Sequence, residues 1–217
     1  MHKPNNLLES DVVDALDWDD LLDDSRIVIK ANDGNVTLTG TVPTYYETTL
    51  AAEYTWSVGG VTGVDNELVI GLVGAAMADA DIAAAATLAL NANRFVPQGA
   101  VTVEVVNGWI TLGGEVRHHY QRQAAEHAVR QVDGLLGITD KIALTSDPIP
   151  SDVVDRINKA LRRNAIIDDS LIQVTNVDHT IYLDGTAGSW AAMTAAEDAA
   201  WAAPGVTDVI DRLVIVP

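Results

Sequence analysis

The chain of 217 residues has no cysteine, one phenylalanine and no long apolar run. The absence of cysteine excludes disulfides and thiolate metal sites, and it removes any redox argument about the cellular compartment. Because no run of ~18 apolar residues occurs, the sequence predicts no transmembrane helix. Residues 1–9 lack the apolar core of a signal peptide. We therefore expect a cytoplasmic protein from the chain as it stands, or a periplasmic one if a signal peptide has been removed.

Basic residues are also scarce. The chain has 13 Lys and Arg against 31 Asp and Glu, which gives a formal net charge of −18. A protein that binds nucleic acid must neutralise phosphates with Lys and Arg, so the composition argues against that class. The charge is uneven, since residues 1–72 hold 13 acidic and 3 basic side chains whereas residues 73–146 hold 7 and 5. The first third of the chain is therefore the acidic one.

A threefold internal repeat dominates what is present. Glycine and aliphatic landmarks recur in the same order in each copy: Leu38, Gly40, Gly60 and Val64; Leu112, Gly114, Gly134 and Ile138; Leu183, Gly185, Gly205 and Val209. The copies are offset by 74 and then 71 residues, and the two glycines of each copy are always 20 apart. Repeats of this length predict three tandem domains, at 1–72, 73–146 and 147–217, rather than a thin-repeat solenoid.

Each copy has the pattern of a helix, two strands, a second helix and a last strand. In copy three, Ser151 is expected to cap a helix that carries Ile157 and Leu161 on one face. Alternating strands follow, joined by Asp33-Gly34 or Asn107-Gly108 in copies one and two. Thr44 and Ser189 are then expected to cap second helices rich in alanine. The sequence predicts an α+β fold of three tandem αββαβ two-layer sandwiches, each a three-stranded mixed sheet covered by two helices.

Six repeat glycines are expected to have structural roles. Gly40, Gly114 and Gly185 interrupt the second strand, where a side chain would crowd the neighbouring helix or demand an unusual φ. Gly60, Gly134 and Gly205 follow the second helices, as helix-ending glycines do. In copy three His179 replaces the hairpin glycine, so either His179 adopts a left-handed conformation or the turn widens.

These motifs together resemble the BON domain, named for bacterial osmotically inducible Y and nodulation proteins. Copy one shows the pattern most fully, in Val36-Thr-Leu38-Thr-Gly40-Thr-Val42 and Gly60-Val61-Thr-Gly-Val64-Asp-Asn66-Glu-Leu68. The resemblance covers roughly residues 5–70, 79–144 and 150–216. It implies a non-enzymatic bacterial stress-response or envelope-associated module that binds phospholipid surfaces or partner proteins. Because some proteins similar to this family bind potassium, a sensor of a small ligand or cation is the alternative.

Motifs for catalysis, cofactors and metals are missing. The acidic stretch from Asp14 to Asp24 fails the pattern of a calcium loop, because Asp19 and Ser25 stand where Gly and Glu are needed, so we interpret it as a solvated helix end. His119 and His127 lack a metal-binding partner three or four residues away. No nucleophile elbow or phosphate loop occurs. We expect no enzyme, no cofactor and no structural metal, and a cation site stays open only as the alternative.

Tryptophan and basic residues supply the candidate surface contacts. Trp56 and Trp201 occupy equivalent positions on the second helices, which favours core or inter-domain packing. Trp109 and Trp190 lie beside turns and are the better candidates for exposed contacts. Arg156, Lys159 and Arg163 form a basic stripe on the first helix of copy three, which either complements the helix dipole or docks on phosphate groups or an acidic surface.

The uneven charge also suggests weak self-association. The basic stripe of copy three is complementary to acidic copy one, either between chains or within one chain. The connections at 71–78 and 146–150 are short, so we expect restricted motion of the domains and a contact within one chain that is harder to form. A compact monomer in which both surfaces are solvated is the other possibility.

Overall fold

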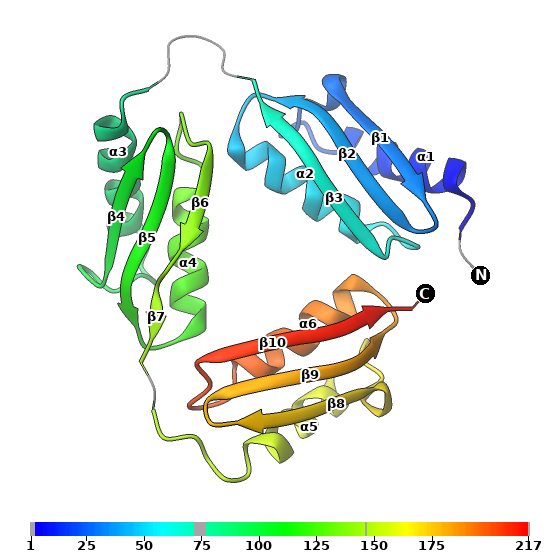
Figure 1. The fold of residues 1–217 in the computed structure, drawn as a ribbon, viewed down its shortest axis with the longest axis vertical. Helices are drawn as coiled ribbons and strands as arrows, with labels where there is room; N and C mark the ends of the chain where they lie inside the picture. The colour runs from blue at the N-terminus through cyan, green and yellow to red at the C-terminus, as the bar shows by residue number, and fades with distance from the viewer. Residues whose placement is uncertain (1–2, 72–76, 146, 217) are drawn as a thin grey trace.

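A computed structural model describes residues 3–71, 77–145 and 147–216 and shows an α+β protein of three repeated units (Figure 1). Unit one contains α1 (Asn5–Asp17), β1 (Ile27–Asn32), β2 (Asn35–Val42), α2 (Tyr45–Ser57) and β3 (Gly63–Ile70). Unit two contains α3 (Asp79–Ala92), β4 (Val101–Val106), β5 (Trp109–Val116), α4 (His119–Val129), β6 (Gly137–Asp140) and β7 (Ala143–Leu144). Unit three contains α5 (Val153–Arg163), β8 (Ile172–Val177), β9 (Thr180–Ala187), α6 (Trp190–Trp201) and β10 (Asp208–Ile215).

The second strand of each unit is the centre of its sheet. It pairs antiparallel with the first strand through the hairpin and parallel with the last strand. The parallel register is the same in every unit, because Val36 pairs with Val64, Ile110 with Ile138 and Ile181 with Val209. The parallel connection needs a crossover, and the second helix supplies it. In unit two the last strand is broken at Lys141 and Ile142 into β6 and β7, both of which pair with β5.

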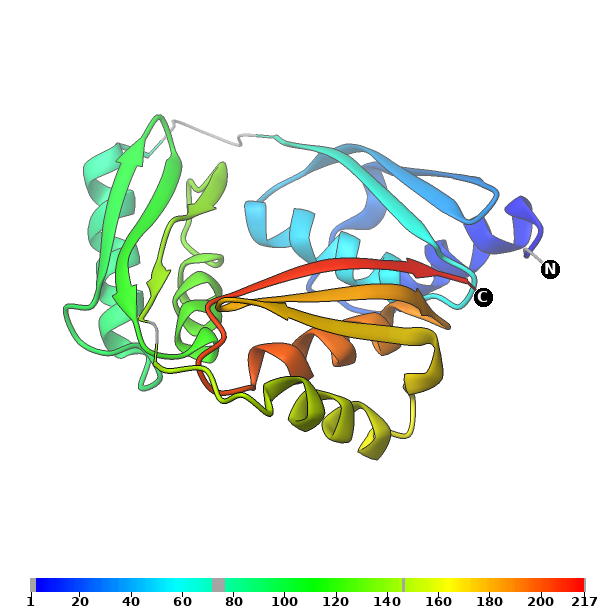
Figure 2. The same cartoon turned by 60° about the horizontal axis from the view of Figure 1, so that its bottom comes forward.

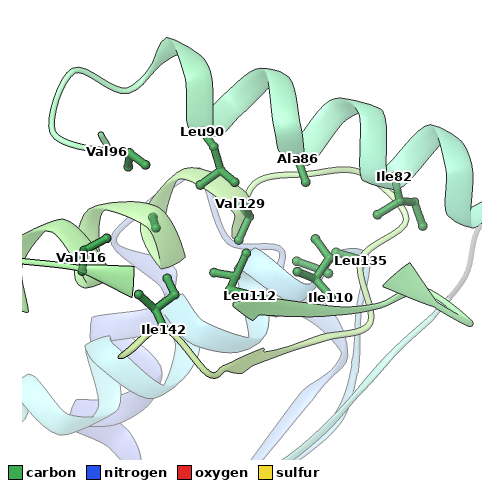
Figure 3. Close-up of a cluster of buried hydrophobic side chains, with 11 residues drawn as sticks. Ile82, Ala86, Leu90, Val96, Ile110, Leu112, Val116, Val129, Leu135 and Ile142 are labelled. Carbon is green, nitrogen blue, oxygen red and sulfur yellow. The ribbon is translucent and has the colours of Figure 1, made fainter. Parts of the chain in front are cut away.

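Both helices of each unit cover one face of its sheet and enclose the core. In unit two Ile82, Ala86 and Leu90 of α3 point towards Ile110 and Leu112 of β5 (Figure 3). Those five side chains are at most 5% exposed. The spacing of the α3 residues places them on one helical face, and alternation along β5 sends its two residues to the same side of the sheet. The three units have separate cores of this kind.

The repeat glycines have the backbone conformations that the sequence predicts. Gly40, Gly114 and Gly185 have φ of +119°, +106° and +132°. A Cβ at these positions would lie 2.0–2.1 Å from the carbonyl oxygen of Arg26, Ala100 or Leu171. The crowding is therefore against the backbone that enters the first strand, and not against a helix as we expected. Gly60, Gly134 and Gly205 also have positive φ, at +101°, +77° and +79°.

Two local predictions are corrected. The hairpin of unit three keeps a two-residue turn, because Val177 pairs with Thr180, and the left-handed residue is Asp178 (φ 54°) rather than His179. His179 instead places its ring Nδ1 2.7 Å from the carbonyl oxygen of Gly205. Helix α5 begins at Val153 with Asp152, not Ser151, at the N-cap position. The Thr44 and Ser189 caps are confirmed, since each hydroxyl accepts a hydrogen bond from a backbone N–H three residues later.

The three units surround a common centre and turn their second helices inward (Figures 1 and 2). Helices α2, α4 and α6 lie on the inner side of their units, while α3 and α5 lie farther out. Unit three thereby returns to unit one, although the two are far apart in the sequence. Among the residues that the structure describes, no helix combines the length and apolar character needed to cross a membrane.

Candidate functional site

The second helices form a closed ring in which the start of each helix meets the end of another. The first residues of the three helices, Tyr45, His119 and Trp190, occupy equivalent repeat positions. The residues at their ends, Trp56, Arg130 and Trp201, are also equivalent. At every junction a residue of the first set meets one of the second, so the contacts are head to tail. Such heterologous contacts make a closed ring when the rotation between units closes, and here three units close it within one chain.

Units one and three meet through two tryptophans. The rings of Trp56 and Trp190 are stacked with centroids 6.2 Å apart and an interplanar angle of 16°. Both side chains are partly buried. Aromatic pairs with this geometry stabilise an interface beyond the apolar area that they bury. The prediction of core or inter-domain packing for Trp56 is confirmed, since it packs against the core of unit one and on Trp190. Trp190, which we expected to be an exposed contact, is its partner across the junction.

Units two and three meet through a sandwich around Trp201. His119 stacks on the Trp201 ring at 3.9 Å with an interplanar angle of 5°, and the Arg122 guanidinium lies 4.7 Å from the ring centroid. Burial first, and then the charge of Arg122, lower the pKa of His119 to about 4. Because an arginine N–H can only donate, the 3.0 Å contact from Arg122 makes the His119 Nδ1 an acceptor. His119 is therefore neutral at pH 7.

Units one and two meet through Tyr45 and an ion-pair cluster. Tyr45 packs against the core of unit two, and this burial raises the pKa of its hydroxyl. Arg130 forms salt bridges with Glu53 of α2 at 3.0 Å and Glu126 of α4 at 2.9 Å. Burial alone would lower the pKa of Arg130, but both carboxylates raise it, so the guanidinium stays charged at the junction.

A central groove of about 710 Å³ lies inside the ring. Its walls come from all three units and include Glu53, His127 and Asp198, which occupy equivalent repeat positions. Phe95 and Tyr120 add aromatic surface and are 48% and 53% exposed. The volume lies within the usual range of small-molecule sites.

A second groove, of about 430 Å³, runs between units two and three. Its lining includes Arg117, Asp147 and Trp201, and it shares Tyr120, Gln123 and Asp198 with the central groove. Arg117 pairs with Asp147 at 3.2 Å. Partial burial raises the pKa of Asp198. The two grooves therefore meet at Asp198 and Tyr120, which line both of them.

An outer groove of about 480 Å³ lies on unit one, between α1 and the end of α2. It is lined by Asp11, Asp14, Ala15, Trp18, Asp19, Tyr54 and Ser57. Trp18, just beyond the end of α1, is 90% exposed, which is unusual for so large an apolar side chain. The Tyr54 hydroxyl donates a hydrogen bond to Asp19, which lowers the pKa of that carboxyl and raises the pKa of Tyr54 to about 12. This bond holds one wall of the groove.

Comparison with known proteins identifies the repeat. The sequence model of the family described as "BON domain" matches three times, at residues 5–71, 78–146 and 151–217. The chain belongs to the BON-domain family. Among curated proteins no relative matches. Two solved structures of CdsD, a structural protein of the type III secretion system of Chlamydia trachomatis, are 13% identical to the chain. They cover 100% and 98% of this chain, and 100% and 93% of their own, with TM-scores of 0.27 and 0.28, values at which the likeness carries no argument.

The BON-domain surfaces keep some of the predicted contacts exposed. Trp109 is 49% exposed at the start of β5, where its indole N–H donates to the Thr139 hydroxyl at 2.8 Å. Arg156, Lys159 and Arg163 are exposed on α5. Arg156 pairs with Asp152 of its own BON domain at 3.0 Å, and no salt bridge between described residues joins these three to the first BON domain. The fold-back within one chain exists but uses α2 and α6, so the prediction that the stripe makes it was wrong. Docking of the stripe between chains stays a prediction.

The acidic stretch of the first BON domain provides no metal cage. Within residues 3–71, 77–145 and 147–216, no group of three or more His, Asp or Glu side chains is arranged to hold a metal ion. Its acids bind local partners instead, as when Asp23 accepts a hydrogen bond from the Ser25 backbone N–H at 3.2 Å.

Three groove residues and one junction residue were not predicted from the sequence: Trp18, Tyr120 and Asp198 line grooves, and Tyr45 lies at the junction of units one and two. For Tyr45 a signal existed, because it is equivalent to His119 and Trp190, and three large rings at one repeat position favour a shared contact. Trp18 also had a signal, as a tryptophan among aspartates just after the apolar face of α1. Tyr120 and Asp198 had none, since they come together only when the units dock.

Proposed function

We propose that this three-domain BON protein is a non-enzymatic binding module that takes a basic segment of a partner protein into its outer groove. The observation that carries the proposal is Trp18, 90% exposed in a groove with Asp11, Asp14 and Asp19. An exposed aromatic anchor surrounded by one sign of charge is complementary to a segment that combines an apolar residue with Lys or Arg. The bacterial osmotic-stress and envelope setting that the family resemblance implies belongs to the same proposal.

The ring supports this choice of surface. The inner ends of the second helices are engaged in contacts between units, at Trp56 with Trp190 and at His119 with Trp201. A macromolecular partner must then use the outward surfaces. Of these, the outer groove combines a hollow, a large exposed ring and the most acidic domain of the chain.

Charge favours a protein partner over an anionic bilayer. The first BON domain has 13 acidic and 3 basic residues, and the groove itself is lined by three aspartates. Anionic headgroups would be repelled there, with a range set by the Debye length of ~8 Å at physiological salt. We expect weak or no binding to anionic liposomes at low salt, and tight binding there would contradict the proposal.

A peptide titration tests the groove. The probe is a fluorescently labelled peptide of alternating lysine and leucine. The control peptide has glutamate in place of lysine. Fluorescence anisotropy should show saturable binding of the lysine peptide alone, and Trp18→Ala should weaken it about tenfold, the loss typical of an interface anchor. Leu88→Ala, which changes a 72% exposed side chain on α3, is the matched control and should bind as the wild type does. Equal affinities for the wild type and Trp18→Ala would refute the proposal.

A further inference from the structure

The central and inter-unit grooves meet at Tyr120, Gln123 and Asp198, and together they follow α4 from the axis of the ring to the edge between units two and three. We propose that this combined groove binds an elongated organic polycation of the linear polyamine class, with one ammonium group on the Asp198 carboxylate. The inference is independent of the partner-protein proposal, because Trp18 lines a different groove.

Charge pairing leaves Asp198 as the carboxylate to be satisfied. Glu53 and Glu126 share the Arg130 guanidinium, and Asp147 pairs with Arg117. Asp198 is exposed, its side chain has no hydrogen-bond or salt-bridge partner among the described residues, and desolvation in the groove raises its pKa. A carboxylate in that position is stabilised by a cation supplied from outside.

The end of α6 adds negative potential at the same place. This helix ends at Trp201, and Ala202 and Ala203 line the inter-unit groove together with Asp198. The last carbonyl groups of a helix carry the negative end of its dipole. The groove therefore offers a helix C-terminus and, in the last turn of the same helix, a carboxylate, and both attract an ammonium group.

Aromatic walls favour an organic cation over a metal ion. The Trp201 ring is already covered by His119 and Arg122. Arg94 covers one face of Phe95 at 4.6 Å, so the aromatic surface left for a ligand belongs to Tyr120 and the rest of Phe95. Tyr120 is half exposed and meets Phe95 edge-on at 6.4 Å. Ring faces attract alkylammonium groups, whereas Mg²⁺ and Ca²⁺ need several oxygen ligands. The described residues hold no group of three or more His, Asp or Glu side chains that could bind a metal ion.

The length of the ligand follows from the shape of the site. The two grooves are continuous through their shared residues, so a compact ion would fill only part of them. The rest of a linear chain can lie along Tyr120 and Gln123, and a further ammonium group can approach Ala202 and Ala203 at the end of α6. Because such a ligand contacts several units, its binding should stabilise the ring by mass action.

Isothermal titration calorimetry with spermidine tests the proposal on the full chain. The expected result is one site, together with a rise in melting temperature that putrescine reproduces less strongly. Asp198→Asn should lower the affinity for spermidine about tenfold, the loss expected for one charge-assisted contact. Tyr120→Leu should lower it too. Asp155→Asn is the control, because it makes the same change of charge in the same unit on a residue of α5 that lines neither groove. It should leave the affinity within about twofold.

Non-specific attraction to a chain of net charge −18 is the competing explanation. Under that explanation Asp155→Asn and Asp198→Asn would weaken binding equally, and MgCl₂ at matched ionic strength would replace spermidine in the melting assay. Either result would overturn the proposal. An Asp198→Asn protein that scatters and melts as the wild type does without ligand confirms that the ring is intact. Trp18→Ala should bind spermidine normally, and Asp198→Asn should bind the lysine peptide normally, so each proposal can fail without the other.

Discussion

At the three equivalent strand glycines, the backbone alone decides which residue is accepted. Gly40, Gly114 and Gly185 combine a positive φ with a carbonyl oxygen placed where a Cβ would stand. The sequence reveals such positions because glycine recurs there while neighbouring side chains change. It does not reveal what the glycine avoids, since the carbonyl belongs to a residue more than ten positions earlier in the chain.

Replacing Gly185 should therefore destabilise its own unit. Gly185→Val places a branched side chain at φ +132° and against the carbonyl oxygen of Leu171, which cannot move without disturbing β8. We expect a loss of ~1–3 kcal/mol in the free energy of unfolding, measured by urea denaturation. Gly188→Val is the control, because a Cβ added at Gly188 would meet no atom within 4 Å and its φ is not positive. Equal losses for the two variants would contradict the backbone argument.

At the scale of elements, local sequence signals predict the helices and strands, but they do not predict which elements contact each other across units. The apolar face of α3, the Asp33-Gly34 turn and the Thr44 cap each act within a few residues, so the pattern identifies them. The contact between Trp56 and Trp190 joins the end of one helix to the start of another across two units. The alignment of Trp56 with Trp201 predicts that both residues pack. It does not predict that Trp56 contacts Trp190 or that Trp201 contacts His119.

The junction of α4 with α6 should depend on pH. His119 has a pKa of about 4 when docked, below its ordinary value of 6.5, because burial and Arg122 disfavour the imidazolium. Because the imidazole binds a proton less readily when docked than when undocked, acid favours the undocked state. The stability of the junction is therefore complete above pH ~6.5 and is lost as pH falls towards ~4. Small-angle scattering should thus show expansion between pH 7 and pH 4.5.

His119→Phe is the matched variant for this experiment, because it keeps an aromatic ring on Trp201 but cannot be protonated. Its scattering should change less over the same pH interval, with any remaining change due to carboxylates such as Asp140, whose pKa burial raises. The same pH response in His119→Phe and the wild type would rule out His119 as the cause.

At the scale of the whole molecule, three equivalent domains make a ring from three chemically different junctions. The equivalent pairs are a tryptophan on a tryptophan, a histidine on a tryptophan, and a tyrosine beside an arginine ion pair. The repeat predicts equivalent positions, but the choice of neighbour depends on how all three units fit together. Overall charge was a poor guide to that choice, because screened charges on exposed helices contribute less than stacked rings at a desolvated junction.

The ring of second helices is the central claim, and small-angle scattering of the full chain at pH 7 tests it most directly. The closed arrangement predicts that the wild-type curve matches the structure and that the double variant Trp56→Ala, Trp190→Ala expands, because unit three then loses its stacked contact with unit one. Trp109→Ala, which removes a tryptophan outside the ring, should leave the dimensions unchanged. The ring would be contradicted if the wild-type protein had the dimensions of three extended domains. It would also be contradicted if the double variant gave the same scattering curve as the wild type.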